Sequence, residues 1–350
     1  MATLDKLIEK ATSGAELSRE DVSLAMRALL DDAVGEDAKA EFLTALARKG
    51  ETAGEIAAFA MELRSRAVDP KIDPAQFGGV VLDVVGTGAD MAQTFNISSC
   101  TIFVVAAAGV AVAKHGNRAI TSKCGSADVL TALGAKIDLS PELARHCLLT
   151  AGVTFLFAPH YHPAFKSIAP VRRKLAERKQ RSVFNILGPL VNPARPTHQL
   201  VGVFERALVG KFAEVLRLLE VKHALVVHGD GLDELSTLGV NTMAELWAGR
   251  IEHTERDFRV PHTSWRGVVV KPEELFGGDA ATNAVIVREV LSGKDRSPRR
   301  DIVLLNAAAA FVVAEKVTDF ASGWNAAVEL IDSGAALEKL DQFVKATNRE

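Results

Sequence analysis

The sequence VVLDVV at residues 80–85 runs directly into GTGAD at residues 86–90, and a helix-like stretch follows at 97–108. A glycine turn between a strand and a helix lets backbone N–H groups close around a phosphate, and the helix N-terminus adds a partial positive charge. A second segment, KHGNR at 114–118, follows another short apolar run and brings cations and an amide. Together the two segments predict a site for a heavily phosphorylated ligand. Neither fits the Walker spacing or a dinucleotide-binding fingerprint, which argues against kinase-type and NAD-binding interpretations.

Length and composition indicate a globular protein of two domains, or of one large domain with an appendage. The chain has 350 residues, of which 48% are apolar and 24% are charged, and these fractions are typical of a chain with a substantial core. Lys and Arg total 41 against 44 Asp and Glu, which leaves a net charge of −3. Because there is no basic excess, the sequence disfavours a general nucleic-acid-binding protein.

Cysteine usage and the N-terminal sequence predict a cytoplasmic protein. Cys100, Cys124 and Cys147 are too few and too scattered for a disulfide framework or a cysteine-based zinc site, so they are interpreted as reduced thiols. The N-terminus lacks the charged-then-apolar pattern of a signal peptide. The most apolar stretch, 97–113, contains Gly109 and ends at a lysine, which favours a buried helix and strand over a membrane span.

The patterns predict a small all-helical domain followed by a larger α/β domain with a mainly parallel sheet. Ser18 with Asp21 and Thr52 with Glu55 have capping-box spacing ahead of apolar residues that share one helix face. Short β-branched strands then alternate with helices, at 80–85, 110–113, 154–157, 199–204 and 225–228.

A stretch rich in Pro and Gly, 67–79, is predicted to link the two domains. A helical piece rich in Lys and Arg, at 163–188, is expected to return to the N-terminal helices. The helical domain is therefore predicted as residues 1–70 completed by 163–190. The α/β catalytic domain is predicted as residues 75–162 and 195–350.

Polar residues cluster where the predicted strands end. The sequence TFNISS at 94–99 can supply helix N-caps, but directly after a glycine turn its hydroxyls and amide are also suited to phosphate oxygens or a metal. Lys114 and Arg118 can be surface charges. The intervening HGN at 115–117, at the end of a strand, favours ligand contact instead, and the polar loop at 122–126 extends this surface.

The sequence HGDGLDE at 228–234 also follows a predicted strand. Asp-Gly is typical of a solvated turn. Adjacent Asp233 and Glu234 are nevertheless suited to Mg²⁺, which takes a few carboxylates together with waters and substrate phosphates. Opposite a phosphate site, the metal interpretation is favoured.

Two further motifs leave alternatives open. APHYHP at 158–163 does not have the spacing of a zinc site; it is suited to packing at a domain junction or to lining a pocket for a planar substrate. Arg172 and Arg173 are either exposed helix charges or partners of a substrate carboxylate. Their position in the sequence does not separate these interpretations.

At these motifs the sequence resembles the anthranilate phosphoribosyltransferase family, which acts in tryptophan biosynthesis and has a nucleoside-phosphorylase-like fold. The resemblance covers nearly the whole chain. The motifs that carry it are GTGAD at 86–90, NISS at 96–99, KHGNR at 114–118, GSAD at 125–128, FNILGPL at 184–190 with NPA at 192–194, and DGLDE at 230–234.

The resemblance implies transfer of a phosphoribosyl group from phosphoribosyl pyrophosphate (PRPP) to the amine of anthranilate, with release of pyrophosphate. It also implies a pair of Mg²⁺ ions and a homodimer formed through the helical domain, with no nucleic-acid or membrane partner. The expected catalytic residues are Lys114, Asp233 and Glu234, and the expected metal ligands are Ser98, Asp233 and Glu234.

The same resemblance assigns the substrate contacts. Anthranilate is expected to contact Gly86, Asn117 and Arg172. PRPP is expected to contact Gly86, Ala89, Asp90, Thr94, Asn96, Ile97, Ser98, Ser99, Lys114, His115, Gly116, Asn117, Arg118, Ala119, Ile120, Thr121, Ser122 and Ser126.

The chain departs from the family pattern in three places. Ala89 stands where the family's turn usually has Gly, Cys124 stands where Ser is usual, and the stretch 176–180 is longer. An Ala at a position that needs a positive φ would strain the turn.

Two other functions remain as alternatives at this point. One is a related pyrimidine nucleoside phosphorylase, which the acidic pair and the Arg172 region disfavour. The other is a non-catalytic, nucleic-acid-binding relative, which the intact phosphate segments and the lack of a basic excess disfavour.

Overall fold

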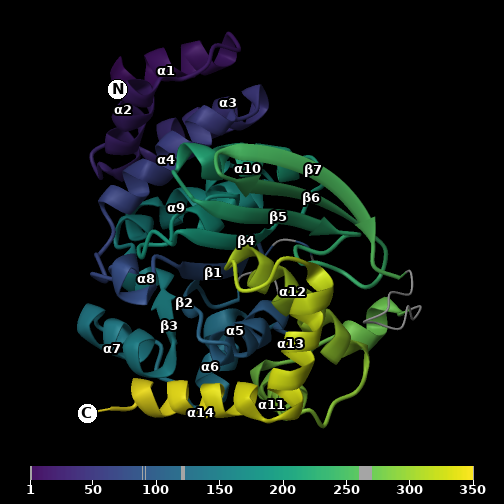
Figure 1. Ribbon diagram of the computed structural model, residues 1–350. Helices are drawn as coiled ribbons and strands as arrows, with labels where there is room; N and C mark the ends of the chain where they lie inside the picture. Colours follow the sequence, from purple (N-terminus) through teal and green to yellow (C-terminus); the bar gives the residue numbers. More distant parts are fainter. Residues whose placement is uncertain (1, 89, 91, 120–122, 260–269, 350) are drawn as a thin grey trace.

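The computed structural model describes residues 2–88, 90, 92–119, 123–259 and 270–349. Its centre is a sheet with the strand order β3-β2-β1-β4-β5-β6-β7 (Figure 1). Strands β1 to β5 pair in parallel, whereas β6 and β7 are antiparallel. The prediction of a mainly parallel sheet is confirmed. The strands are β1 Val81–Gly86, β2 Ala111–Gly116, β3 Val153–Phe157, β4 His198–Gly202, β5 His223–Gly229, β6 Val240–Trp247 and β7 Arg250–Asp257.

The strand order brings the polar motifs to one edge of the sheet. Strand β1 ends at Gly86, β2 at Gly116 and β5 at Gly229, and parallel strands end at the same edge. Strands β2 and β3 lie on one side of β1, and β4 and the later strands lie on the other side. The direction of the strand order therefore reverses at β1. α/β sheets bind ligands at the end of the strands beside such a switch point. Lys114, His115 and Gly116 lie within β2, so the predicted strand end at residue 113 is wrong.

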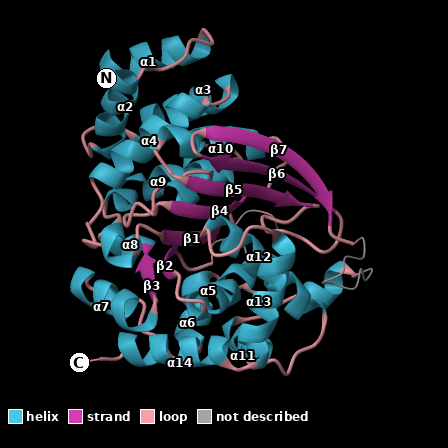
Figure 2. Cartoon of the chain, in the orientation of Figure 1, coloured by secondary structure: helices cyan, strands magenta, loops and turns pink. Residues whose placement is uncertain are grey.

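Helices cover both faces of the sheet (Figure 2). On one face, helix α5 is buried from Ile97 to Ala106 except at Ser98, because it lies between the sheet and the C-terminal helices. These helices share one apolar core with β1, β2 and β3. They are α5 Ile97–Ala107, α6 Ser126–Ala132, α7 Pro141–Ala151, α11 Ala280–Leu291, α12 Pro298–Val313, α13 Phe320–Asp332 and α14 Ala335–Thr347.

The N-terminal helices pack with α9 and α10 against the other face, in a second apolar core that also includes residues of β4, β5 and β6. Helix α9 lies beside α2 and α3 (Figure 1), as expected for a helical piece that returns to the N-terminal helices. The exact domain limits stay a prediction. The helices of this core are α1 Ala2–Thr12, α2 Arg19–Leu30, α3 Glu36–Lys49, α4 Ala53–Ser65, α9 Ala164–Glu177 and α10 Leu208–Leu218.

Local sequence signals account for the starts of two helices. The Ser18 hydroxyl accepts from the backbone N–H of Asp21, and the Thr52 hydroxyl accepts from that of Glu55. In both cases the acidic side chain accepts in return from the N-cap backbone. Both predicted capping boxes are confirmed, and each satisfies two N–H groups that the helix itself cannot.

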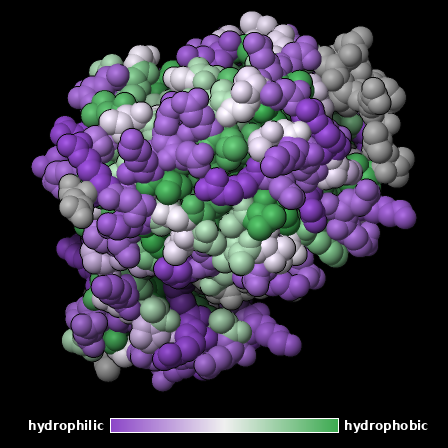
Figure 3. Space-filling view, turned by 90° about the horizontal axis from the view of Figure 1, so that it is seen from below, coloured by the Kyte–Doolittle hydropathy of each residue, from purple (hydrophilic) through white to green (hydrophobic). Residues whose placement is uncertain are grey.

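Short helical turns complete the chain. They are α8 Ala158–Tyr161 and the 3₁₀ segments η1 Pro74–Phe77, η2 Val183–Asn185, η3 Gly188–Leu190 and η4 Pro272–Leu275. The face seen in Figure 3 is mostly hydrophilic, with hydrophobic residues in patches between the polar ones. Within the described ranges, no helix is long and apolar enough to cross a membrane.

Candidate active site

The glycine turn after β1 is built around the carboxylate of Asp233. Asp233 Oδ2 accepts hydrogen bonds from the Thr87 hydroxyl at 3.1 Å and from the backbone N–H of Gly88. A Cβ atom on Gly86 would lie 2.6 Å from the same oxygen. Glycine is therefore required at residue 86 by the approach of Asp233, whereas Gly88 is required by its φ of 69°.

The acidic pair is not a solvated turn. Asp233 is only 7% exposed, and Glu234 is half-buried. Burial raises the pKa of Asp233 well above its usual value, and the nearby charges of Asp90 and Glu234 add to the effect. Burial likewise raises the pKa of Glu234 to about 7, against the opposing charge of Lys114. Buried carboxylates that repel one another form a site that a cation would stabilise.

Lys114, Ser98 and Glu234 meet at the N-terminus of α5. The Lys114 ammonium donates to the Ser98 hydroxyl at 3.1 Å and to the backbone carbonyl of Val84 at 2.5 Å. The backbone N–H of Ser98 donates to Glu234 Oε1 at 3.2 Å. The structure thus brings the predicted metal ligands and the predicted catalytic lysine together. Burial lowers the pKa of Lys114, while the charges of Asp83, Glu234 and Asp233 oppose this shift.

The donors in this cluster suit a hard cation. The carboxylates of Asp233 and Glu234 and the hydroxyl of Ser98 are the oxygen ligands that Mg²⁺ prefers. Among the described residues there is no group of three or more His, Cys, Asp or Glu side chains that could hold a metal by themselves.

Asn96 stands at the N-cap position of α5, but its side chain makes no capping hydrogen bond. The Asn96 amide instead donates to the carbonyl of Cys124 at 3.2 Å and accepts from Asn283 at 2.8 Å. The simple N-cap interpretation of this residue is therefore wrong. Asn96 connects the start of α5 with the loop after β2 and with α11. Thr94 forms a backbone bridge with Phe276.

The loop after β2 is held by Asp128. Asp128 accepts hydrogen bonds from the Arg118 guanidinium at 2.9 Å and from the backbone N–H groups of Ala119 and Gly125 at 2.9 and 3.0 Å. These contacts bring both ends of the loop together.

Gly116 and Ser126 are also in close approach, since a Cβ on Gly116 would lie 2.3 Å from the Ser126 hydroxyl. That hydroxyl donates to the backbone carbonyl of Asn117 at 3.3 Å. Ala89, Ile120, Thr121 and Ser122, which the sequence assigned to PRPP, lie outside the described residues.

A row of rings connects β2 with Arg172. His115 and His162 have ring centroids 5.2 Å apart, and His162 and Phe165 have centroids 5.4 Å apart. The Arg172 guanidinium lies 5.8 Å from the Phe165 ring centroid. Burial lowers the pKa of Arg172, whereas Arg173 is exposed. The structure thereby separates two arginines that the sequence could not.

Tyr161 belongs to the core and not to a pocket. Its side chain is fully buried, and its hydroxyl donates to the carbonyl of Leu139 at 3.0 Å. Asp83 and Asn283 belong to none of the sequence motifs, and Asn192 was noted only as part of NPA; all three form polar contacts behind the site. The signal for Asp83 was a single charge within an apolar strand.

Comparison with known protein families separates the N-terminal helices from the rest of the chain. Residues 5–67 match the helical bundle domain of a glycosyl transferase family, and residues 78–337 match the a/b domain of that family.

Individual relatives cover almost the whole chain. The anthranilate phosphoribosyltransferase of Methanocorpusculum labreanum is 46% identical over 337 residues, which are 96% of each chain. That of Chloroflexus aggregans is 46% identical over 336 residues, again 96% of each chain.

Solved structures agree. The crystal structure of anthranilate phosphoribosyltransferase from Thermus thermophilus has a TM-score of 0.88 and 38% identity, covering 98% of this chain and 99% of that one. The enzyme from Saccharomyces cerevisiae in complex with PRPP and Mg has a TM-score of 0.83 and 26% identity, covering 99% and 98%. The chain therefore belongs to the anthranilate phosphoribosyltransferase family.

Proposed function

We propose that this protein transfers the phosphoribosyl group of PRPP to the amine of anthranilate and releases pyrophosphate, as a step of tryptophan biosynthesis. The observation that carries the proposal is the meeting of Lys114, Ser98, Asp233 and Glu234 around the Gly86 turn at the switch point of the sheet. Cationic, hydroxyl and backbone N–H donors at one edge, beside buried carboxylates, suit a pyrophosphate bound together with a cation.

In the proposed reaction the anthranilate nitrogen forms a bond to C1 of the ribosyl group as the bond from C1 to pyrophosphate oxygen breaks. The electron pair of that bond leaves with pyrophosphate, and the amine loses one proton to solvent. Because an aromatic amine is already a nucleophile, no covalent enzyme intermediate is needed. Lys114, beside the Gly86 turn, binds the phosphates and stabilises the departing charge.

Asp233, Glu234 and Ser98 would hold Mg²⁺, and we propose a pair of ions. When bound, Mg²⁺ would neutralise charge on the leaving pyrophosphate. The Saccharomyces cerevisiae relative is described in complex with PRPP and Mg, which supports this assignment.

On the acceptor side, Asn117 and Arg172 would orient anthranilate and contribute proximity. Burial lowers the pKa of His115 to about 3, so its ring is neutral. Its Nδ1 lies 3.2 Å from the carbonyl of Gly188 and therefore carries the hydrogen. The other nitrogen, Nε2, has no partner among the described residues.

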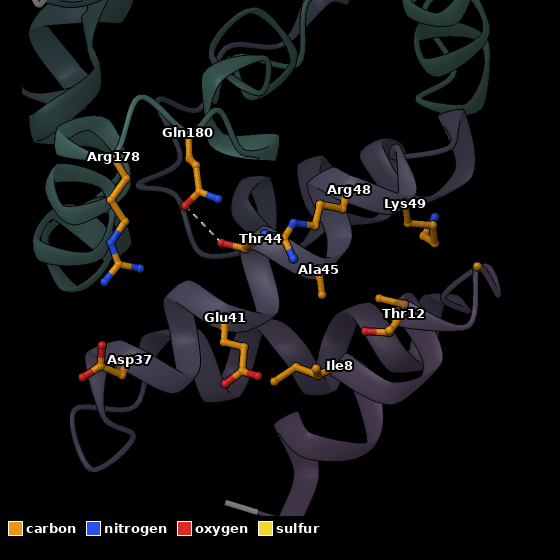
Figure 4. Close-up of a pocket in the computed structure, with 12 residues that line it drawn as sticks. Ile8, Thr12, Asp37, Glu41, Thr44, Ala45, Arg48, Lys49, Arg178 and Gln180 are labelled. Carbon is orange, nitrogen blue, oxygen red and sulfur yellow. Dashed lines mark hydrogen bonds between the residues drawn. The ribbon is translucent and has the colours of Figure 1, made fainter.

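We further propose a homodimer formed through the helical unit of residues 1–70 and 163–190. An open cavity of about 710 Å³ lies in this unit, between α1, α3 and the segment after α9 (Figure 4). Thr44 of α3 and Gln180 contact each other across it at 3.5 Å. Sedimentation of the purified protein at micromolar concentration should give twice the monomer mass. A monomer would contradict the dimer without affecting the proposed reaction.

The cysteines support a cytoplasmic location, because Cys100, Cys124 and Cys147 are free and buried, as expected in a reducing compartment.

The function itself is tested by the loss of anthranilate fluorescence on addition of PRPP and Mg²⁺, with pyrophosphate measured in parallel. Equal amounts of anthranilate consumed and pyrophosphate released are expected. Phosphate-dependent release of a free base from a pyrimidine nucleoside, without anthranilate consumption, would overturn the proposal.

A further inference from the structure

Residues 188–190 present three consecutive backbone carbonyls, and a different element of the fold supplies a side chain to each. His115 Nδ1, near the end of β2, lies 3.2 Å from the first. Gln199 Nε2 of β4 donates to the second at 3.2 Å, and Arg64 Nε of α4 donates to the third at 2.8 Å. This segment therefore joins the helical unit to the sheet directly behind the proposed phosphate site.

Asn192, which follows this segment, is fully buried and binds to both neighbouring strands. Its amide nitrogen donates to Asp83 Oδ2 of β1 and to the carbonyl of Ala113 of β2, both at 2.8 Å. The other carboxylate oxygen of Asp83 accepts from the backbone N–H of His115 at 3.4 Å. The Asp83 carboxylate is thus connected to β2 on both sides of Lys114, directly at His115 and through Asn192 at Ala113.

Asp83 is fully buried, and a buried carboxylate is costly unless it is paired. Burial raises the pKa of Asp83 to about 6, while the charge of Lys114 and the hydrogen bonds from Asn192 and His115 act in the opposite direction. The carboxylate is therefore mostly ionised at neutral pH. The Lys114 ammonium donates to two neutral groups, Val84 O and Ser98 Oγ. Neither group carries a negative charge, whereas the nearby Asp83 carboxylate does and so helps to keep Lys114 protonated.

We infer that Asp83, held by Asn192, is a positioning residue that sets the backbone on both sides of Lys114 and thereby directs its ammonium to the phosphates of PRPP. The inference rests on the proposed function of Lys114. It also gives the buried Asn192 of the NPA motif a role, since that residue lies far from the Gly86 turn in sequence and contacts the site through Asp83 and Ala113 of β2. A merely structural carboxylate would stabilise the fold without acting through Lys114.

A double-mutant cycle between Asp83→Asn and Lys114→Ala tests the inference in the full-length protein. The Asn side chain keeps the size and one acceptor of Asp83 but loses its charge. We expect Asp83→Asn to lower kcat/KM for PRPP by about tenfold or more in the otherwise unaltered chain, and by less than about threefold when Lys114 is already Ala. If turnover of the Lys114 variant is too slow to measure, the dissociation constant of PRPP is measured in all four proteins of the cycle instead of kcat/KM.

Asp301→Asn is the matched control. Asp301 is a carboxyl of α12 whose pKa burial raises to about 6, beside Arg300, and it has no assigned role in the site. This substitution should leave kcat/KM for PRPP unchanged in both backgrounds.

Equal losses from Asp83→Asn with and without Lys114, or a lower melting temperature with unchanged kcat/KM, would overturn the inference. If Asp83→Asn does not fold, Asn192→Ala takes its place in the cycle, with the same expected non-additivity. Failure of the proposed function would be distinguishable, because the unaltered chain would then show no turnover of PRPP with anthranilate.

Discussion

Gly202 and Asp233 are in such close contact that a Cβ atom on Gly202 would lie 1.5 Å from the backbone carbonyl oxygen of Asp233. Gly202 ends β4, the strand beside β1. The position of the acidic pair is therefore fixed by a backbone-to-backbone contact, as well as by the hydrogen bonds of the Asp233 side chain to Thr87 and Gly88. Any side chain at residue 202 must move the loop that carries the proposed metal ligands.

Gly202→Ala should therefore lower both stability and activity. Overpacking of this kind costs roughly 1–3 kcal/mol in the free energy of unfolding, and the displaced carboxylates should lower kcat and flatten the dependence of rate on Mg²⁺. Urea denaturation and initial rates across a Mg²⁺ titration measure the two effects. Gly35→Ser is a suitable control, because a Cβ atom on Gly35 would have no neighbour within 4 Å and the site should accept the change. Wild-type kcat and Mg²⁺ response in Gly202→Ala would show that the loop tolerates displacement.

Replacing both carboxylates, Asp233→Asn with Glu234→Gln, should reduce kcat by about 10²-fold or more, the scale for losing a preorganised electrostatic group. The melting temperature should stay constant or rise, because the change removes the repulsion between a buried and a half-buried carboxylate. Asp230→Asn, an exposed position in the same loop, serves as the control and should retain activity. Near-normal turnover of the double variant would refute the metal-ligand assignment.

Arg172→Ala should raise KM for anthranilate, because it removes a charge-assisted contact worth roughly 1.5–3 kcal/mol, while KM for PRPP changes little. Arg173→Ala, one residue further along α9 and exposed, provides the comparison and should resemble the unaltered protein. Steady-state kinetics with each substrate varied in turn separate the two constants. If Arg172→Ala weakens both substrates equally, the anthranilate carboxylate binds elsewhere.

The acidic pair should contribute a loss of stability as the pH rises from about 5 to 7 when Mg²⁺ is absent. The pKa of Glu234 in the folded protein is raised to about 7, and that of Asp233 is also raised. The folded protein therefore binds more protons than the unfolded chain in this window, and it loses stability as the pH rises through the folded pKa values. Urea unfolding at a series of pH values measures the slope. Glu234→Gln should reduce it, and saturating Mg²⁺ should raise stability most at about pH 7 and above. An unchanged slope in Glu234→Gln would assign the protons to other groups.

The strands that end at the site were predictable as short apolar runs, although β2 continues past its apolar residues through Lys114 and His115 to Gly116. The β6–β7 hairpin was not. Strand β7, RIEHTERD, is an exposed edge strand with no apolar periodicity, and its connection turns at Ala248 and Gly249, both with positive φ. Ala-Gly is a weak turn signal compared with Asn-Gly, so neither the strand nor the turn could be recognised locally.

The site was predictable through its motifs, but the contacts behind it were not. Asp83 and Asn192 are 109 residues apart in sequence, and no local pattern links them. Likewise, the burial of Asp233 depends on its approach to Gly86 and Gly202, which only the folded sheet creates. Asp233 and Glu234 follow an Asp-Gly turn signal in the sequence, yet in the structure the first is buried and the second is half-buried.

The apolar core that α1–α4 share with α9 has a consequence for the order in which the chain folds during synthesis. Residues 4–63 and 168–191 belong to the same core, yet β1, β2 and β3 lie between them in sequence. The first helices to leave the ribosome must therefore wait, with part of their apolar surface in water, until α9 and the segment after it have emerged. Domains usually fold from the N-terminus onward. In this chain the N-terminal unit is completed only after three strands of the sheet have been synthesised.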